Sequence, residues 1–316
     1  MSIRIVNLEG ESVAVGFRTP SMPHEWIEYP LTPAGRVVER LQGAQVAIIN
    51  KVKLTAADLA QLPDLKMVAV AATGTDNIDL AACRERGVVV SNVRGYAVNT
   101  VPEHAILLMM ALRRSLLAYH DDVQKGLWAK SGNFCLFGHP VGDLHGATLG
   151  IFGSGSLGQG VALLAAAFGM NILYGERRGA EAVREGYTAF ETVLREADVI
   201  SMHCPLNDST RGMIGAAELR MMKPTAVLVN TSRGGLVDEQ ALADALRAGV
   251  IAGAGIDVLS KEPPTEGNPL LATDIPNLIV TPHMAWASET AMKALTDQVI
   301  DNIEAFVAGS PRNRVA

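Results

Sequence analysis

The sequence contains few cysteines and no long basic run, and both shortages narrow the classes of protein to consider. Cys83, Cys135 and Cys204 are the only cysteines in 316 residues, and no two of them form a C-x-x-C pair. This number and spacing indicate thiols of a reducing compartment, not a disulfide framework or a zinc site, and we expect no metal. The net charge is −6 and no basic cluster exceeds two adjacent arginines, so we expect no nucleic-acid partner.

A membrane anchor and a secretory signal are also missing from the pattern. The opening residues, MSIRIVNLEGE, lack the basic stretch and following apolar segment of a secretory signal. Residues 144–175 carry no Asp, Glu, Lys or Arg, but glycines crowd positions 150–160, where each would weaken a helix by about 1 kcal/mol. We therefore expect a cytoplasmic protein with no membrane partner.

The same glycines fit a strand, a turn and a helix. Apolar residues 147–152 predict a buried strand, GSGSLG at 153–158 has the G-x-G-x-x-G spacing, and an Ala/Leu-rich helix follows over 159–169. In this spacing Gly153 permits a tight turn, Gly155 lets the backbone approach a pyrophosphate, and Gly158 lets helix and strand pack closely. Because a helix N-terminus also offers free N–H groups to anions, the pattern predicts dinucleotide binding.

The residues after the next strand, 171–174, bear on which dinucleotide is bound. Glu176 is placed to accept hydrogen bonds from both hydroxyls of an adenosine ribose, and its charge would repel a 2′-phosphate. Arg177 and Arg178 follow directly, and two adjacent arginines either clamp such a phosphate or are simply solvated. We expect NAD(H) as the cofactor, with NADP(H) as the alternative.

Strands alternate with helices along the whole chain, which predicts an α/β fold with parallel sheets covered on both faces. Strands are expected at 3–6, 46–49, 67–71, 88–91, 147–152, 171–174, 199–203, 226–230, 253–257 and 278–281. Helices are expected at 56–61, 80–86, 102–119, 159–169, 191–196, 216–222, 238–248 and 289–308. Because the glycine turn comes only at residue 153, we expect a discontinuous substrate domain, 1–98 and 288–316, around a dinucleotide-binding domain, 99–287.

Three polar residues follow successive strands of the dinucleotide-binding domain. Arg233 lies in TSRGGLVDE, Glu262 in DVLSKEPP and His283 in TPHMAWAS, so all three belong to one edge of the sheet. Each alone has an ordinary explanation, as a solvated arginine, a loop charge or a turn histidine. Together they offer a guanidinium fork for a carboxylate and an imidazole that exchanges protons near neutrality, with a carboxylate to orient the ring. With a nicotinamide, this set predicts hydride transfer to a 2-keto acid.

These motifs, with GSGSLG, resemble the D-isomer-specific 2-hydroxyacid dehydrogenases from about residue 45 to the end. The resemblance implies a Rossmann domain inserted into a flavodoxin-like substrate domain, with Arg233, Glu262 and His283 catalytic. AATGTDNID, 71–79, resembles the family's substrate loop, which implies that Thr73 and Gly74 hold the substrate carboxylate. Further substrate contacts are expected from Asn50, Lys51 and Trp286. The resemblance implies cofactor contacts by Thr100, Ser156, Leu157, Glu176, Cys204, Pro205, Thr210, Thr231, Asp257 and His283.

KSGNFCLFGHPVGDLHGATLGIFG and PHMAWAS resemble the glycerate dehydrogenases, or hydroxypyruvate reductases, of this family. We expect reduction of hydroxypyruvate or glyoxylate to D-glycerate or glycolate, by a homodimer joined through the apolar helix 102–119 and the segment 120–145. Two alternatives stay open. The enzyme could serve another acid (D-lactate, phosphite or a branched 2-keto acid), or the chain could be a corepressor-like protein that senses NAD(H).

Overall fold

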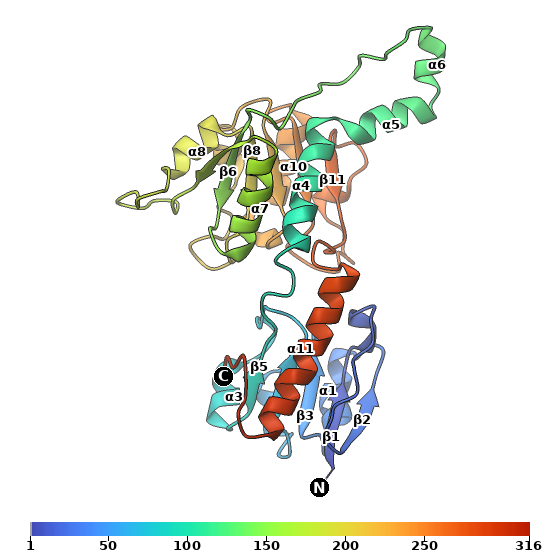
Figure 1. Cartoon of the computed structure of the whole chain (residues 1–316), viewed down its shortest axis with the longest axis vertical. Coiled ribbons are helices and arrows are strands. Elements are labelled where there is room, and N and C mark those ends of the chain that lie inside the picture. The colour runs from blue at the N-terminus through green and yellow to red at the C-terminus, as the bar shows by residue number, and fades with distance from the viewer. Residues whose placement is uncertain (1) are drawn as a thin grey trace. The chain divides into compact units, whose positions relative to one another are not determined.

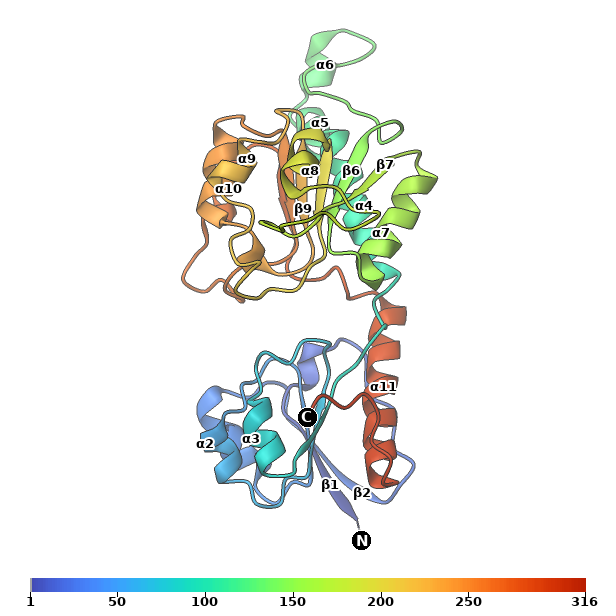
Figure 2. The ribbon, with the colours of Figure 1, turned by 90° about the vertical axis from the view of Figure 1, so that its left-hand side faces the viewer.

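The computed structural model describes residues 2–316, and it divides the chain into two compact units. The first unit consists of Met1–Ala97 and Ala287–Ala316, and the second is the continuous segment Val98–Trp286. Each unit contains one parallel sheet with helices packed against it (Figures 1 and 2). The expected α/β class is therefore confirmed for both units.

The sheet of the first unit has the strand order β2-β1-β3-β4-β5, and all its strand pairs are parallel. The strands are β1 (Ile3–Asn7), β2 (His24–Glu28), β3 (Val46–Ile49), β4 (Met67–Val70) and β5 (Val89–Ser91). The helices are α1 (Val37–Leu41), α2 (Ala56–Ala60), α3 (Leu80–Glu85) and α11 (Glu289–Val307). The order 2-1-3-4-5 is that of flavodoxin-like sheets.

Strand β2 and helix α1 were not expected from the sequence. Strand β2 lies at the edge of the sheet and none of its residues is fully buried, so it has no continuous apolar run. By contrast, every residue of β3 and β4 is buried, and both strands stand out as apolar runs. The periodicity of a sequence detects central strands more readily than edge strands.

The sheet of the second unit has the order β7-β6-β8-β9-β10-β11, again with parallel pairs throughout. The strands are β6 (Thr148–Phe152), β7 (Asn171–Tyr174), β8 (Val199–Met202), β9 (Val227–Asn230), β10 (Gly253–Ile256) and β11 (Leu278–Val280). Helices α4 (Thr100–Arg113) and α7 (Ser156–Ala167) share one apolar core with the sheet. A second core holds α8 (Phe190–Glu196), α9 (Ala216–Leu219) and α10 (Glu239–Arg247), so the sheet is covered on both faces.

The uncharged run 144–175 forms β6, the glycine turn, α7 and β7, as the glycine spacing predicts. No helix within residues 2–316 combines the length and the apolar character needed to cross a bilayer. The single helix expected over 102–119 is wrong. Helix α4 ends at Arg113, because Ser115 adopts a left-handed backbone conformation with φ 46° and donates its hydroxyl to the Pro140 carbonyl at 2.7 Å.

A new helix, α5 (Leu116–Gln124), starts after this break and leads into α6 (Leu127–Ser131). Together with the segment that returns to β6, these helices form an arm, residues 116–143, that projects from the second unit (Figure 1). The arm exposes large apolar side chains, including Phe134 at 93% and Phe137 at 90% of their accessible surface.

Candidate active site

The candidate site lies along the carboxyl edge of the six-stranded sheet in the second unit. Strand order reverses at β6, since β7 lies on one side of it and β8 on the other. In open α/β sheets, ligands bind at the carboxyl ends of the strands beside such a reversal. The glycine turn begins directly after β6, and Arg233, Asp257 and His283 follow β9, β10 and β11 along the same edge.

Two glycines of the turn, Gly153 and Gly158, are required by close packing of the backbone. A Cβ on Gly153, whose φ is 105°, would lie 2.4 Å from the His203 carbonyl carbon, and one on Gly158 would lie 2.0 Å from the Gly153 oxygen. A Cβ on Gly155 would meet nothing within 4 Å, so the turn is open on that side. Helix α7 then begins at Ser156 without a side-chain cap. Such a turn can bring backbone N–H groups against a pyrophosphate.

Two buried polar atoms at this edge also fit a polar ligand. Within residues 2–316, neither Thr231 Oγ1 nor His203 Nδ1 has a hydrogen-bond partner, although both are buried. Buried polar groups in folded proteins are normally paired, so such atoms mark positions where a ligand can bond. Burial also lowers the pKa of His203 to about 4, so its ring is neutral at pH 7. The open turn and these atoms fit the expected dinucleotide.

Glu176 follows β7 as expected, but its carboxylate is already occupied. It is 3% exposed and accepts hydrogen bonds from the backbone N–H groups of Arg177, at 2.8 Å, and Arg184, at 3.1 Å. The Arg184 guanidinium adds two bonds, from Nε at 2.6 Å and from Nη2 at 2.8 Å. Hydrogen bonding from that guanidinium, and then from the Arg177 N–H, lowers the pKa of Glu176 to about 2. Arg178 pairs with Glu218 at 2.8 Å.

His283 and Glu262 form a direct pair. His283 Nδ1 lies 2.6 Å from Glu262 Oε2, and the other carboxylate oxygen accepts from the Leu259 N–H at 2.7 Å. About 30% of each side chain is exposed, 29% for the histidine and 31% for the glutamate. This contact orients the ring through Nδ1 and leaves Nε2 to exchange a proton with a ligand.

Asp257 holds the turn that carries His283. The carboxylate is 1% exposed and accepts from Thr281 Oγ at 2.5 Å and from the Met284 and Ala285 N–H groups, both at 2.9 Å. The His283 N–H donates to the Asp257 carbonyl at 2.8 Å, and His283 itself has a left-handed φ of 53°. Sequence reasoning placed Asp257 at the nicotinamide and missed this role, although an acid ending a buried strand is a visible signal.

The turn after β9 presents Arg233. Asn230, which is 1% exposed, donates to the Arg233 carbonyl at 2.9 Å and accepts from the Ser232 N–H at 3.0 Å. A Cβ on Gly234 would lie 2.0 Å from the Leu259 carbonyl carbon, so the turn touches the loop that leads to Glu262. Asn230 was missed from the sequence, because it looks like the last residue of an apolar strand.

Other expected cofactor residues lie in loops at the same edge. The Cys204 carbonyl accepts from Ser232 Oγ at 2.7 Å, and the Thr210 hydroxyl donates to the Pro205 carbonyl at 2.7 Å. Burial raises the pKa of Cys204 to about 11, so it is a neutral thiol. Thr100 begins α4 and donates its hydroxyl to the Ala285 carbonyl at 3.2 Å. Trp286 is the last residue of the second unit and is partly buried.

The expected substrate residues of the first unit follow β3 and β4. The buried Glu9 carboxylate accepts from three consecutive N–H groups, those of Asn50, Lys51 and Val52, with shortest distances of 2.6, 2.8 and 2.9 Å. This carboxylate, which the sequence did not point to, fixes the loop. The Thr73 hydroxyl donates to the Val93 carbonyl at 2.8 Å.

The loop after β4 also leaves backbone donors available. The N–H groups of Thr73 and Gly74 have no acceptor in the part of the chain that the structure describes. The loop is held from its other side, because Asn92 donates to the Thr73 carbonyl at 2.7 Å. Two adjacent free N–H groups in a fixed loop are suited to a carboxylate.

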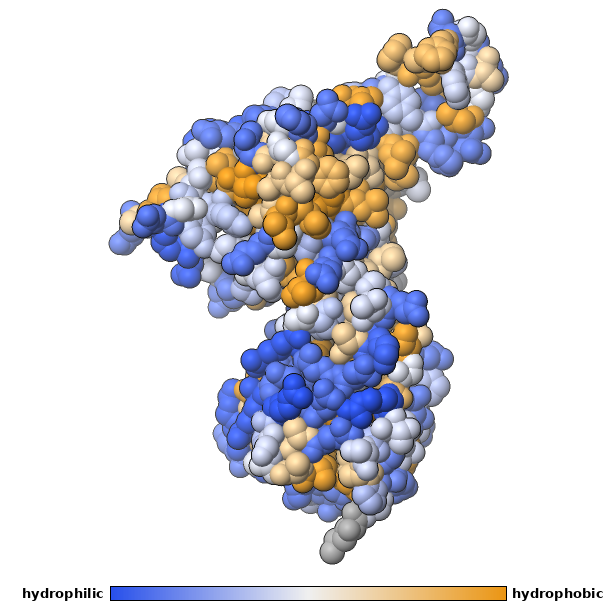
Figure 3. All heavy atoms as spheres, viewed as in Figure 1, coloured by the Kyte–Doolittle hydropathy of each residue, from blue (hydrophilic) through white to orange (hydrophobic). Residues whose placement is uncertain are grey.

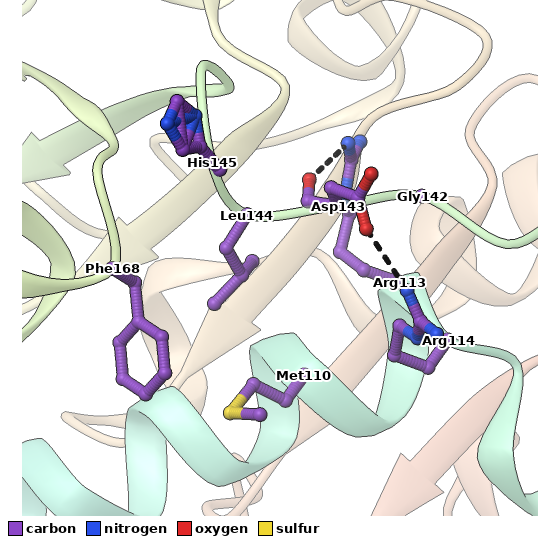
Figure 4. Close-up of a pocket in the computed structure, with 8 residues that line it drawn as sticks. All are labelled: Met110, Arg113, Arg114, Gly142, Asp143, Leu144, His145 and Phe168. Atoms are coloured by element: carbon purple, nitrogen blue, oxygen red, sulfur yellow. Dashed lines mark hydrogen bonds and ion pairs between the residues drawn. The ribbon is translucent and has the colours of Figure 1, made fainter.

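A separate cavity of about 260 Å³ lies at the opposite edge of the six-stranded sheet. Figure 4 shows its lining residues, which are Met110, Arg113, Arg114, Gly142, Asp143, Leu144, His145 and Phe168. Leu144 and His145 precede β6, and Phe168 precedes β7, so the cavity lies at the amino ends of these strands. It contains none of the residues expected to bind cofactor or substrate.

Residues 106–285 match the family described as D-isomer specific 2-hydroxyacid dehydrogenase, NAD binding domain. A glycerate dehydrogenase of Methylorubrum extorquens is 51% identical over 316 residues, covering 100% of this chain and 99% of the relative. The chain belongs to the D-isomer specific 2-hydroxyacid dehydrogenase family.

Two other proteins are similar to this chain over most of its length. A hydroxypyruvate reductase of Blautia hydrogenotrophica is 34% identical over 288 residues, covering 90% of this chain and 89% of the relative. The solved structure of an NADPH-dependent glyoxylate/hydroxypyruvate reductase from Sinorhizobium meliloti, in complex with citrate, matches with a TM-score of 0.83 and 31% identity. That match covers 99% of this chain and 98% of the other.

As a 2-hydroxyacid dehydrogenase, the chain is an oxidoreductase that acts on the CH–OH group and has an NAD-binding domain. The expected family, enzyme class and NAD cofactor are therefore confirmed. When bound, the nicotinamide supplies or accepts the hydride of the reaction.

Proposed function

We propose that this dehydrogenase reduces hydroxypyruvate or glyoxylate to D-glycerate or glycolate. The 2.6 Å contact between His283 Nδ1 and Glu262, on the cofactor edge of the sheet, carries the proposal. This contact orients an imidazole that can exchange a proton with a substrate, at the sheet edge where we place the cofactor. The names of the glycerate dehydrogenase, hydroxypyruvate reductase and glyoxylate/hydroxypyruvate reductase relatives support the choice of substrate.

In this proposal each polar residue has one task. Arg233 binds the carboxylate of the 2-keto acid through its guanidinium fork. In the first unit, the free N–H groups of Thr73 and Gly74 are assigned to the substrate by the family resemblance. His283 donates a proton from Nε2 to the oxygen on C2 and, in the reverse direction, removes it as a neutral base. Glu262 keeps the ring oriented through its contact with Nδ1. The remaining substrate contacts are assigned to Asn50, Lys51 and Trp286.

We also propose which residues contact the dinucleotide. The pyrophosphate is bound by the glycine turn and the start of α7, which contribute Gly153, Gly155, Ser156, Leu157 and Gly158. The adenosine ribose is contacted by the loop after β7, which contributes Glu176, Arg177 and Arg178. The adenosine is contacted by the loop after β8, which contributes Cys204, Pro205 and Thr210. The nicotinamide end is contacted by Thr100, Thr231, Asp257 and His283.

A homodimer is the assembly that the exposed apolar surface supports. Apolar side chains continue from α4 along the arm, and Figure 3 shows apolar residues gathered on this face of the second unit. The exposed members include Leu107, Met110, Leu116, Leu117, Val123, Leu127, Trp128, Phe134 and Phe137. Exposed apolar residues gathered in this way are typical of a protein interface.

A panel of 2-keto acids with NADH, followed at 340 nm, tests the proposed substrate. We expect the highest kcat/KM for hydroxypyruvate or glyoxylate, and the D-enantiomer of glycerate as the product of hydroxypyruvate. A clear preference for pyruvate or a branched 2-keto acid, or for phosphite oxidation with NAD⁺, would replace this substrate. Tight NADH binding without turnover of any acid would instead favour a sensing role.

A further inference from the structure

The carboxylate expected to bind the adenosine ribose has no acceptor position left for it. A carboxylate has about four lone-pair sites, two on each oxygen. On Glu176, Oε1 accepts from the Arg177 N–H and from Arg184 Nη2, and Oε2 accepts from the Arg184 N–H and Nε. A ribose hydroxyl could bond to this carboxylate only by displacing one of these donors.

Arg184 is also fixed from its other side. Its guanidinium carbon lies 3.8 Å from the centre of the Tyr187 ring, in a cation–π contact. The Tyr187 hydroxyl is 2.5 Å from Ser154 Oγ, so the loop that carries Arg184 is tied to the glycine turn itself. The backbone closes the same loop, because Glu176 N–H donates to the Thr188 carbonyl at 2.8 Å. The pair of Glu176 and Arg184 is therefore held in place by several contacts of the loop at this edge of the sheet.

A planar guanidinium bound to both carboxylate oxygens compensates the charge that would repel a phosphate. Arg177 follows Glu176 directly, its N–H is held on that carboxylate, and its side chain is exposed. No ion pair involving the Arg177 side chain is present within residues 2–316, whereas Arg178 is paired with Glu218. One guanidinium at the ribose position thus remains available to an anion. Glu181 and Glu185 lie further along the loop and are exposed.

We propose that Arg184 determines cofactor specificity: by occupying Glu176, it lets this dehydrogenase accept a 2′-phosphorylated adenosine ribose, that of NADP(H), as well as the ribose of NAD(H). Arg177 binds the added phosphate. The proposal deepens the cofactor contacts proposed above and rests on Glu176 lying at the ribose. It does not depend on which keto acid is reduced.

Calorimetric titration of the full-length protein with 5′-AMP and with 2′,5′-ADP (adenosine 2′,5′-bisphosphate) tests this without catalysis. The two probes differ only in the 2′-phosphate. We expect the wild-type Kd values to lie within about 10-fold of each other. In Arg184→Met the bare Glu176 carboxylate should repel the 2′-phosphate. The ratio of Kd values should therefore move at least about 10-fold in favour of 5′-AMP, which corresponds to one charge-assisted contact. Arg247→Met is the control: it removes a guanidinium on α10 that is paired with Asp274, and it should leave the ratio of Kd values unchanged.

The double variant Arg184→Met/Glu176→Gln separates charge compensation from loop structure. Removing the uncompensated charge should return 2′,5′-ADP binding to within about 3-fold of wild type; a ratio that stays as low as in the single variant overturns the proposal. Glu176→Gln alone serves if Arg184→Met does not fold. This variant should bind 5′-AMP within about 3-fold of wild type, whereas a 10-fold loss would make Glu176 the ribose acceptor after all. A wild-type preference for 5′-AMP over 2′,5′-ADP above 100-fold also refutes the proposal.

This design keeps two failures apart. A protein that turns over no keto acid still yields a Kd ratio, so an incorrect substrate does not affect the result. Conversely, a wild type that rejects 2′,5′-ADP leaves the proposed reduction with NADH intact.

Discussion

Replacing Asp257 with asparagine tests whether a buried carboxylate positions His283, the proposed acid–base residue. The substitution conserves the shape of the side chain and removes its charge. In the structure Oδ1 accepts from Thr281 and Met284, and Oδ2 accepts from the Ala285 N–H. An asparagine can keep only one of these oxygens, so its NH₂ group would face at least one buried donor.

The expected loss of stability follows from those contacts. One buried donor left unpaired costs about 1–3 kcal/mol, and hydrogen bonds to a neutral acceptor are weaker than those to a carboxylate. We therefore expect the free energy of unfolding to fall by about 2–4 kcal/mol. The turn also carries His283, and a misplacement of about 1 Å at a catalytic group can lower the rate about 100-fold. We expect kcat to fall by 10- to 100-fold.

Urea denaturation and steady-state kinetics measure both effects in the same preparations. Asp244→Asn is a suitable control, because Asp244 is 63% exposed on α10 and should change the free energy of unfolding by less than about 0.5 kcal/mol. An Asp257→Asn variant with wild-type stability and wild-type kcat would show that these hydrogen bonds do not hold the turn.

Four further predictions follow from other contacts. His283→Ala should lower kcat at least about 100-fold with an unchanged unfolding midpoint, and a near-wild-type rate would remove His283 from the mechanism. Arg233→Met should lower kcat/KM for the keto acid by about 10- to 100-fold, and unchanged values would place the carboxylate elsewhere. Hydrogen bonding from Arg18 lowers the pKa of Glu304 to about 2. The contribution of this ion pair to the free energy of unfolding is therefore complete above the ordinary pKa of 4.5 and is lost as pH falls toward 2. The stability difference between wild type and Glu304→Gln should therefore shrink over that range in denaturation curves, and a constant difference would contradict the ion pair. Leu117→Asp, at an exposed position of α5, should convert a dimer into a monomer in light scattering, and a persisting dimer would exclude this surface.

The site was largely predictable where one residue type does one local job. Gly153 and Gly158 are required because a Cβ on either would lie less than 3 Å from backbone atoms, those of His203 and of Gly153 respectively. The central strands are short runs of buried residues. Parallel strands place their carboxyl ends at one edge, so the order of Arg233, Asp257 and His283 along the chain was enough to assign them to it.

The failures came from contacts that no spacing rule encodes. The break between α4 and α5 depends on the left-handed Ser115 and on its bond to Pro140, 25 residues along the chain. The edge strand β2 has no apolar run, because only one of its sides pairs with the sheet. Neither feature alters the periodicity from which helices and strands are predicted.

The sequence by itself determined the family, the parallel α/β architecture and the sheet edge at which we propose that the chemistry takes place. These depend on hydrophobic periodicity and on glycines that only one backbone path allows. The tertiary structure decided what the acids do. Glu176 is bound by an arginine eight residues away in an irregular loop, and Asp257 by donors from the turn after β11. A carboxylate bonds to whichever donors the folded chain brings within about 3 Å, and that proximity is absent from the linear order of residues.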